Sequence, residues 1–525
     1  MAQNLPDNTD IVTGVRILRP AHGGTCFAHA NDKPIFVSGA IPGEVVDVRI
    51  DSRRSRVSYG TAVNIVEPSQ HRQPHIWPEG EKLGVGGADL GHVTPAYQRQ
   101  WKSDVIKDQL SRVGGADTLE HVLETVGESA LTVAPATGDE TGSLLNRRTR
   151  VDFEVSPNGR LAMKREASNE LVEIETMPLA DESILELGLL GDSAWRKFFK
   201  PGKRVRAIAP NAGGRRVLIG NQTFNASQHR VEDQATWEVE AAGYKAKFEV
   251  HTAGFWQAHR SAPQDLVELV LAAARVQPGQ SVIELYSGAG LLTKFLAHQL
   301  GSEGAIISVE GSRQAVADAR RNMEGTHAER DIRSGRIDGR QVLRAWSDLG
   351  ERPDVIVLDP PRSGAGRDVV KAIGAVQPKR VVLVSCDPAA GARDIKELRQ
   401  VGYSLETFHP IDLFPQTHHL ETVAVLSRKS ASKSFIPVSI SPKDMGLSEE
   451  KEQPTYANIR DYVQKTHGMK VSSLYVAQMK AECGLETQAD RSGDKKQPKC
   501  PPEKREAILD AFRHFGLIGE DGTEE

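Results

Sequence analysis

The chain has few cysteines, no long hydrophobic run and no excess of one sign of charge. Its 525 residues include four cysteines, which are too few and too scattered for a disulfide scaffold. No apolar stretch approaches the ~18 residues that cross a bilayer. The first ten residues also lack the basic and apolar regions of a signal peptide. We therefore expect a soluble cytoplasmic protein without membrane contact.

The formal net charge of -4 argues against a broadly basic coat that binds nucleic acid without specificity. It leaves room for local basic surfaces, such as the turn that holds Arg53, Arg54 and Arg56 and the cluster from Arg147 to Arg150. Such clusters can meet RNA phosphates, although a solvated loop explains the charge alone equally well. The length is too great for one core and predicts two to four domains.

Patterns along the chain predict an α/β protein of four parts. Short β-rich runs separated by Gly and Pro are typical of an OB-like barrel, and alternating helices and apolar strands are typical of a doubly wound parallel sheet. A mixed α+β region with a helix near 97–113 separates these two parts, and a polar linker over 429–450 precedes predicted helices. The expected domains are a barrel (8–69), a central domain (70–250), a sheet domain (251–430) and a small helical C-terminal extension (445–525).

Two predicted strands bring reactive side chains to one edge of that sheet. The apolar run 381–384 is followed by Cys386, and the run 355–358 ends at Asp359. Ligands of open α/β sheets bind just beyond the carboxyl ends of such strands. A thiol and a carboxylate are therefore expected in one cleft, although a lone cysteine is more often a small buried hydrophobic residue.

A nucleotide-like cofactor is expected beside them. The predicted strand 281–285 runs into Tyr286-Ser287-Gly288-Ala289-Gly290, where glycines let the backbone approach a ligand at a helix start. The next strand ends in Glu310, which could accept both hydroxyls of a ribose. A nicotinamide cofactor also fits this pattern. Gly-Ala-Gly lacks the full three-glycine fingerprint, however, and Asp359-Pro-Pro-Arg is foreign to that fold, so S-adenosylmethionine is favoured.

Two motifs closely resemble the RNA uracil-5-methyltransferase family, which methylates carbon 5 of uridines in transfer or ribosomal RNA. Residues 411–421, Ile-Asp-Leu-Phe-Pro-Gln-Thr-His-His-Leu-Glu, resemble its closing signature. Asp359-Pro-Pro-Arg-Ser-Gly, followed by Ser385-Cys-Asp-Pro, resembles its second motif. The resemblance implies a Rossmann-like class I methyltransferase domain, an N-terminal TRAM barrel and a central RNA-binding domain.

The resemblance also implies the site residues and the partner. Cys386 matches the family nucleophile, which adds to carbon 6 of uracil, and Glu421 matches the general base that removes the carbon-5 proton. Phe255 could lie against the target base or be packed core. The partner would be rRNA or tRNA with a uridine flipped from an unpaired loop, bound by a monomer. The positions expected to bind S-adenosylmethionine are Gln257, Tyr286, Glu310 and Asp359.

The chain departs from the family at several positions. Many members carry a four-cysteine iron-sulfur site, but here Val85, Ala88 and Met177 stand at matching positions. Neither Val nor Ala can supply a thiolate, so we predict no cluster, no other metal, and a central domain held by packing. Ala390 replaces a common threonine after the nucleophile, and Glu284 replaces the usual aspartate of the first strand.

The residues are also compatible with two other functions. One is a different RNA methyltransferase on the same fold, acting on cytosine carbon 5 or on an exocyclic nitrogen. The other is a non-catalytic RNA-binding factor. Nitrogen methylation needs no cysteine nucleophile, so the paired presence of Cys386 and Glu421 favours carbon-5 chemistry, and the same intact pair argues against a non-catalytic factor. Cytosine carbon-5 methylation also uses a thiol, but the closing signature resembles the uracil family.

Overall fold

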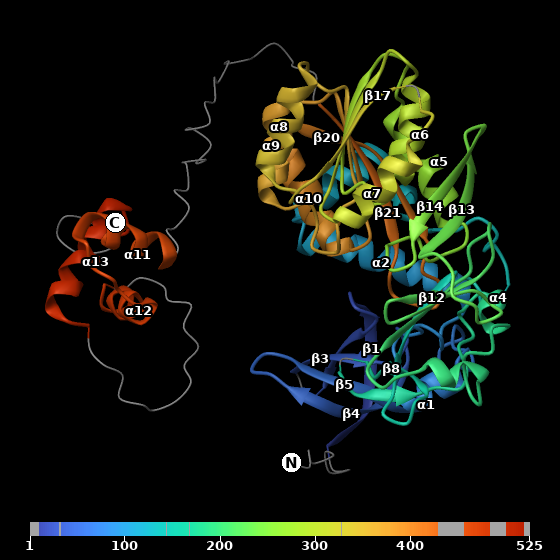
Figure 1. Cartoon of the computed structure of the whole chain (residues 1–525). Coiled ribbons are helices and arrows are strands. Elements are labelled where there is room, and N and C mark those ends of the chain that lie inside the picture. Colours follow the sequence, from blue (N-terminus) through green and yellow to red (C-terminus); the bar gives the residue numbers. More distant parts are fainter. Residues whose placement is uncertain are drawn as a thin grey trace. The chain divides into compact units, whose positions relative to one another are not determined.

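A computed structural model forms two compact units, Met1–Ser430 and Ala431–Glu525 (Figure 1). The predicted linker at 429–450 lies outside the described residues. No helix within the described part of the chain is long and apolar enough to cross a membrane. The structure describes residues 10–30, 33–142, 144–166, 168–326, 328–428, 456–483 and 500–518.

The first unit begins with a closed five-stranded barrel, which confirms the predicted OB-like barrel. Alternate side chains of each strand point inward, so that Cys26, Ala28, Ile35 and Val37 are all fully buried. The residues between them face outward. The strands pair in the order β1-β2-β3-β5-β4, with bounds β1 (Ile11–Pro20), β2 (Cys26–Ala30), β3 (Lys33–Ser38), β4 (Val45–Arg53) and β5 (Ser58–Glu67).

A central segment follows, built on a six-stranded antiparallel sheet. The strand order is β12-β11-β10-β7-β8-β9. The strands are β7 (Arg150–Val155), β8 (Leu161–Lys164), β9 (Leu171–Glu173), β10 (Arg204–Ile208), β11 (Arg216–Ile219) and β12 (Gln222–Phe224). The helices before and within this segment are α1 (Pro78–Leu83), α2 (Pro95–Arg112), α3 (Ala116–Val126) and α4 (Glu182–Leu185). The sequence prediction of a helix near 97–113 is thus confirmed by α2.

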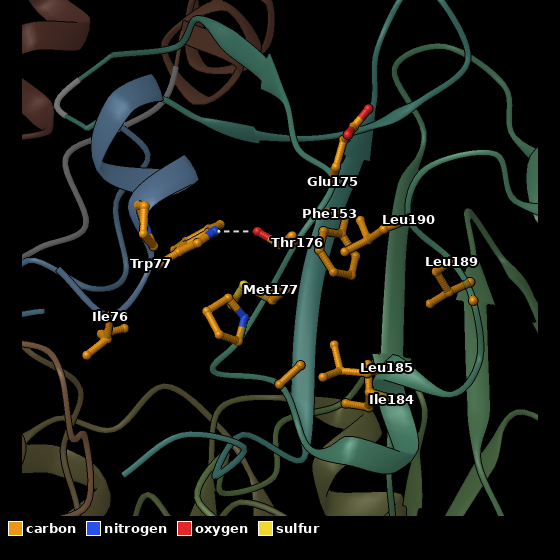
Figure 2. Close-up of a pocket in the computed structure, with 14 residues that line it drawn as sticks. Ile76, Trp77, Phe153, Glu175, Thr176, Met177, Ile184, Leu185, Leu189 and Leu190 are labelled. Carbon is orange, nitrogen blue, oxygen red and sulfur yellow. Dashed lines mark hydrogen bonds between the residues drawn. The ribbon is translucent and has the colours of Figure 1, made fainter. Parts of the chain in front are cut away.

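The positions that match the iron-sulfur ligands of the family resembled by the sequence lie in an apolar core. Val85, Ala88 and Met177 are 8%, 3% and 2% exposed and pack in one cluster with Trp77 and Phe153. A cavity of about 570 Å³ opens beside Met177, lined mainly by apolar side chains (Figure 2). Hydrophobic contacts thus occupy the place where soft metal ligands would be needed.

The remainder of the first unit carries a mostly parallel eight-stranded sheet in the order β17-β16-β15-β18-β19-β21-β20-β6. The order reverses direction between β15 and β18, and β21 runs antiparallel to both β19 and β20. The strands are β6 (Ala134–Pro135), β15 (Ser281–Leu285), β16 (Ala305–Glu310), β17 (Glu329–Ser334), β18 (Val355–Leu358), β19 (Arg380–Ser385), β20 (Tyr403–Asp412) and β21 (Glu421–Arg428). This doubly wound arrangement confirms the predicted fold class.

Both faces of this sheet are covered. Alternate residues of one strand enter different cores: Val282 packs with one cluster, whereas Ile283 packs with the other. A two-stranded hairpin of β13 (Gln234–Ala241) and β14 (Tyr244–His251) joins the first cluster. The helices are α5 (Ala262–Ala274), α6 (Leu291–Leu300) and α7 (Arg313–Asn322) in the first cluster, and α8 (Gly339–Leu349), α9 (Arg367–Val376) and α10 (Pro388–Gln400), with α2 and α3, in the second.

The second unit is helical in its described residues and has its own small core. Ile459, Val463, Ile508 and Phe512 are fully buried there, on helices that the sequence predicts for this region. Cys483 and Cys500 are half-buried against this core. The helices are α11 (Tyr456–His467), α12 (Ser473–Glu482) and α13 (Pro502–His514).

Candidate active site

One cavity of about 810 Å³ opens where β15, β18 and β19 end, next to the reversal of strand order. Cys386 directly follows β19, Asp359 directly follows β18, and Glu421 is the first residue of β21. The structure therefore brings together groups that are far apart in the chain, such as Gln257 and Glu421, which are separated by 164 positions. The predicted site residues that line this cavity are Gln257, Tyr286, Glu310, Asp359, Cys386 and Glu421.

The Cys386 thiol lies where its ionised form is disfavoured. Burial raises its pKa to about 12, and the carboxyls of Glu421 and Asp359 act in the same direction. The Arg362 guanidinium opposes them, because its positive charge favours a thiolate. Cys386 is therefore a protonated thiol in the free protein near neutral pH, and it must lose a proton before it can act as a nucleophile.

Two carboxyls line the cavity beside the thiol. Burial raises the pKa of Asp359 to about 7. Burial, and then the charge of Asp359, raise the pKa of Glu421 well above its ordinary value. Glu421 is 4% exposed, and within the described part of the chain its Oε1 has no hydrogen-bond partner. A buried carboxyl oxygen in that state is costly to the fold, so this atom is available to a ligand or a reacting proton.

The opposite wall of the cavity is built from the ends of β15 and β16. Glu310 accepts hydrogen bonds from the backbone N–H of Gly288 to Oε2 (3.0 Å) and of Ser312 to Oε1 (2.7 Å). Tyr286 has a φ of 65°, and its hydroxyl donates to the carbonyl of Ala365. The hydroxyl of Ser287 is buried and, within the described residues, unpartnered. The turn thus offers a fixed carboxylate and a free hydroxyl to a ligand.

Glu284 is fully enclosed beneath this turn. Its Oε2 accepts hydrogen bonds from the hydroxyls of Thr293 (2.5 Å) and Ser308 (2.9 Å). Burial raises its pKa to about 7 despite these bonds. One of its two oxygens is therefore committed to holding α6 and β16 together.

Phe255 is 63% exposed, so the interpretation of this residue as packed core is wrong. Its ring lines the cavity, and the guanidinium carbon of Arg150 lies 5.0 Å from the ring centroid. An exposed aromatic ring at the rim, held by a cation, is a surface on which a planar base can stack.

The loop that leads to Glu421 is fixed by polar residues of α2, which sequence reasoning missed. The buried ammonium of Lys102 pairs with Asp412 (2.5 Å). The side-chain amide of Gln98 donates to the side chain of Gln416 and accepts from its backbone N–H (2.8 and 2.9 Å). Gln98 and Lys102 are four residues apart, so the signal in the sequence is a polar pair on the buried face of a helix. These bonds hold the closing signature in place.

The barrel also contacts the loop that follows β19, a contact that nothing in the sequence indicated. His22, in the turn between β1 and β2, bonds through Nε2 to Oδ2 of Asp387 (2.9 Å). The other oxygen of Asp387 accepts the backbone N–H of Ala390 and caps α10. Although burial acts to raise it, these bonds lower the pKa of Asp387, so its carboxylate stays ionised next to Cys386.

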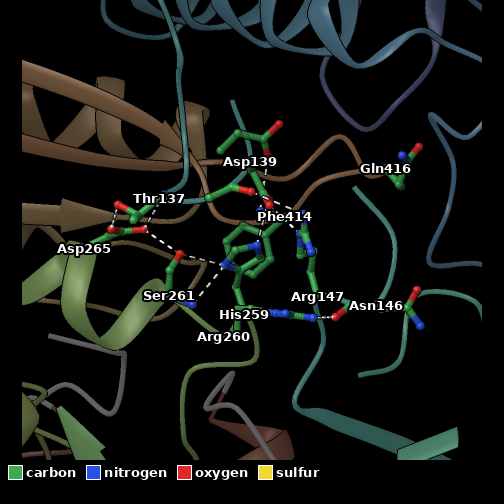
Figure 3. A network of polar contacts seen from close by, with 12 residues as sticks. Thr137, Asp139, Asn146, Arg147, His259, Arg260, Ser261, Asp265, Phe414 and Gln416 are labelled. Atoms are coloured by element: carbon green, nitrogen blue, oxygen red, sulfur yellow. Dashed lines mark hydrogen bonds and ion pairs between the residues drawn. The ribbon is translucent and has the colours of Figure 1, made fainter. Parts of the chain in front are cut away.

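A buried polar network holds the chain just after Gln257 (Figure 3). His259 bonds through Nε2 to Asp139 (2.9 Å) and through Nδ1 to Ser261 (3.0 Å), and Arg147 also donates to Asp139. The Ser261 hydroxyl donates to Asp265 (2.7 Å), and the backbone N–H of Ser261 faces the same Nδ1. Because that hydroxyl is engaged by a carboxylate, this serine is no activated nucleophile, and the network is a brace for the cavity wall.

Comparison with known proteins places this geometry in context. Residues 227–429 match the family described as tRNA (uracil-5-)-methyltransferase, and residues 12–63 match the TRAM domain. An uncharacterized RNA methyltransferase of Bifidobacterium longum is 34% identical over 446 residues, covering 81% of this chain and 98% of the relative. The 23S rRNA (uracil(1939)-C(5))-methyltransferase RlmD of Alkalilimnicola ehrlichii is 30% identical, and the match covers 78% of this chain and 95% of the relative.

Among solved structures, the Pyrococcus abyssi tRNA (uracil-54, C5)-methyltransferase, in complex with S-adenosyl-L-homocysteine, superposes with a TM-score of 0.54. The two chains are 21% identical, and the match covers 78% of this chain and 99% of that one. At this identity the likeness shows a shared fold.

Proposed function

The chain belongs to the RNA uracil-5-methyltransferase family, and from that premise we propose that it methylates carbon 5 of a uridine in ribosomal or transfer RNA, with S-adenosylmethionine as the methyl donor. The observation that carries the proposal is that one cavity holds both a thiol, Cys386, and a buried carboxyl with a free oxygen, Glu421. Carbon-5 methylation of a pyrimidine requires both groups, one to add to the ring and one to remove a proton.

The residues of the cavity fit S-adenosylmethionine. Glu310 is held by backbone N–H groups at the end of β16, where each oxygen keeps a lone pair for a ribose hydroxyl. Gly288 has a φ of +55° and open space around its Cα, so a ligand can approach its backbone. Gln257, Tyr286 and Asp359 line the same cavity. When bound, the cofactor supplies an electrophilic methyl group on a cationic sulfonium.

Cys386 would add to carbon 6 of the uracil ring, which makes carbon 5 nucleophilic. Because the pKa of the thiol is raised, its proton would pass to a base as the carbon-sulfur bond forms, and Asp359, a carboxyl of the same cavity with a pKa of about 7, would accept it and return it when the thiol leaves. The neighbouring carboxyls are placed to influence this step, since their charges act on the thiol. Arg362, whose guanidinium donates to Nε2 of His419 (3.0 Å), favours the thiolate and the negative charge that develops on the ring.

Glu421 would remove the proton from carbon 5 after methylation, so that the thiol can leave and the aromatic ring is restored. A carboxyl whose pKa is raised by burial is a stronger base than an exposed one, and its operating pH moves toward neutrality. The closing signature places this residue at the start of β21, and the bonds from α2 to that signature keep it there.

The RNA would present an unpaired uridine, because a stacked base cannot enter this cavity. Phe255 and Arg150 at the rim support such a base by stacking and by charge. We further propose that residues 8–69 and 70–250 bind RNA, that residues 251–430 carry out the reaction, and that the enzyme acts as a monomer in the cytoplasm.

The test is nucleoside mass spectrometry of ribosomal and transfer RNA from cells with and without the gene. Loss of 5-methyluridine from one RNA class would support the proposal and identify the substrate class. Loss of 5-methylcytidine or of an N-methylated base instead would point to the other methyltransferases on this fold. An unchanged profile in both RNA classes, together with no methyl transfer in vitro, would contradict it.

Two variants test the chemistry. Cys386→Ala is expected to abolish turnover while S-adenosylmethionine still binds, and Cys500→Ala, a half-buried cysteine of the second unit, is the matched control. Glu421→Gln is expected to accumulate a protein-RNA adduct that survives a denaturing gel. Retained methylation by Cys386→Ala would remove the covalent route, and a Glu421→Gln variant that turns over normally would remove the base.

A further inference from the structure

An aromatic row crosses the outer surface of the barrel. Phe27 on β2 stands directly opposite Phe36 on β3, and Phe36 is in register with Tyr59 on β5. Their ring centroids are 5.8 and 5.7 Å apart, and the second pair is stacked at an angle of 26°. His29 adds an edge contact to Phe27 at 5.1 Å. The row thus spans three neighbouring strands.

These rings face away from the barrel core. Their chain neighbours Ala28, Ile35 and Val37 are fully buried, and side chains of a strand alternate between its two faces. Phe27, Phe36 and Tyr59 are half-buried, and His29 is exposed. The outward face of a small barrel is normally polar, so a row of aromatic rings there indicates a surface that meets something apolar and flat.

An arginine caps each end of the row. The guanidinium carbon of Arg19, which is in register with Phe27, lies 4.8 Å from that ring, and that of Arg54 lies 5.1 Å from the Tyr59 ring. Arg19 is held by Asp108 (3.1 Å), whereas Arg54 and its neighbour Arg56 make no ion pair within the described residues. The row is therefore bordered by positive charge that is available to an anionic partner.

The turn that follows Arg19 contacts the loop that holds Cys386. Arg19 is the penultimate residue of β1, and His22, three positions later, bonds to Asp387 beside the nucleophile Cys386. Gly24, in the same turn, is packed so closely against Asp89, and against His418 of the closing signature, that a Cβ would clash with them. The aromatic row therefore begins three residues from a contact with the catalytic loop.

We propose that Phe27, Phe36 and Tyr59 form a stacking platform for unpaired bases of the substrate RNA that flank the target uridine. The inference rests on the proposed function for the identity of the partner. Every base has a flat face, so such a platform binds single strands with little dependence on sequence, while Arg54 and Arg56 contact the phosphates. Flanking unpaired nucleotides held there would keep the target uridine unstacked.

Cross-strand aromatic pairs can also serve only to stabilise a sheet. Binding of a fluorescein-labelled oligouridine to the full-length protein, measured by fluorescence anisotropy, separates the two roles. Phe36→Leu and Tyr59→Leu keep an apolar side chain but lose the ring, and each is expected to weaken binding roughly tenfold. Phe36→Trp should bind at least as tightly as the parent. Val63→Ala, an exposed residue of β5 outside the row, is the control.

A second comparison distinguishes stacking from phosphate contact. An abasic oligonucleotide of the same length should bind the parent and Phe36→Leu equally, because it has no bases to stack. Arg54→Gln should lower the slope of log affinity against log salt by about one, whereas Phe36→Leu should leave that slope unchanged. Folding of each variant is followed by thermal unfolding, and affinity for S-adenosylmethionine should be unaltered.

The proposal is overturned if folded Phe36→Leu and Tyr59→Leu bind the oligouridine like the parent. It is equally overturned if these variants lose as much affinity for the abasic strand as for the oligouridine. A change of oligomeric state in these variants with intact RNA binding would also overturn it. Methylation of RNA is measured separately. Ring-dependent binding without any methyl transfer would retain the platform and refute the proposed function, whereas methylation without ring dependence would do the reverse.

Discussion

The reactivity of Cys386 toward a small alkylating reagent follows directly from its surroundings. A thiol pKa of about 12 is three units above the ordinary 9.0, so near neutral pH its thiolate fraction is about a thousandfold smaller than that of a free cysteine. Thiolates of higher pKa are intrinsically better nucleophiles. With a Brønsted slope of about 0.4–0.5, the rate constant of the Cys386 thiolate should be roughly 15- to 30-fold larger than that of a free cysteine thiolate. Alkylation should therefore be about 30- to 60-fold slower than that of glutathione.

The assay is iodoacetamide labelling at pH 8, followed by quantification of the Cys386 peptide over time. The half-buried Cys483 and Cys500 in the same digest serve as internal references. The Cys386 rate should rise with pH through pH 9 without reaching a plateau. Because the Glu421 carboxyl raises the thiol pKa, Glu421→Gln should label faster, yet still more slowly than glutathione, since burial is the larger cause.

Arg362→Gln provides the opposite perturbation, because removal of its positive charge should slow labelling further. Adding S-adenosylmethionine, whose sulfonium is cationic, should speed labelling relative to the neutral S-adenosylhomocysteine, provided that the reagent can still enter. The reasoning is refuted if Cys386 labels as fast as glutathione, or if its rate reaches a plateau with a midpoint below pH 9. Such a result would mean that the site stabilises a thiolate before substrate binds.

Three further predictions concern the cofactor, the fold and the metal. Asp359, with its pKa near 7, becomes charged as pH rises through that value, so affinity for S-adenosylmethionine in calorimetry should increase from pH 6 to pH 8 while that for S-adenosylhomocysteine changes less. Lys102→Met leaves Asp412 buried without its partner and should lower the free energy of unfolding by about 3–5 kcal/mol in urea titrations. Replacing both residues by apolar ones should recover most of that loss. A Lys102→Met variant with the free energy of unfolding of the parent would contradict this. Because Val85 and Ala88 pack in an apolar core, the purified protein should be colourless, and a chelator should change neither its activity nor its stability; a brown, iron-containing sample would refute this.

Much of the fold could be predicted because its signals are local. Strands β15 and β18 have the predicted bounds, since short β-branched runs bounded by turn residues are distinctive in sequence. The helix α2 was likewise predicted to within two residues at its start. The turn after β15 and the acid at the end of β16 were also visible, because a strand end fixes where the next side chains emerge.

The contacts that hold the site together could not be predicted in this way. His22 and Asp387 are 365 positions apart, and Lys102 and Asp412 are 310 apart. Periodicity reports which face of an element is buried, but it does not say which distant element will cover that face. Glu284 illustrates the same limit, since its carboxylate turned out to bind the hydroxyls of neighbouring elements.

The sequence by itself determined the chemical identity of the site: a thiol and a carboxyl at strand ends, a glycine turn with an acid beyond it, and motifs that name a family. Only the tertiary structure decided their electrostatic state. The pKa of Cys386 depends on how deeply the thiol is buried and on which charges surround it. Burial and distance between remote side chains arise from packing of the whole chain, so they exist only once the fold has formed.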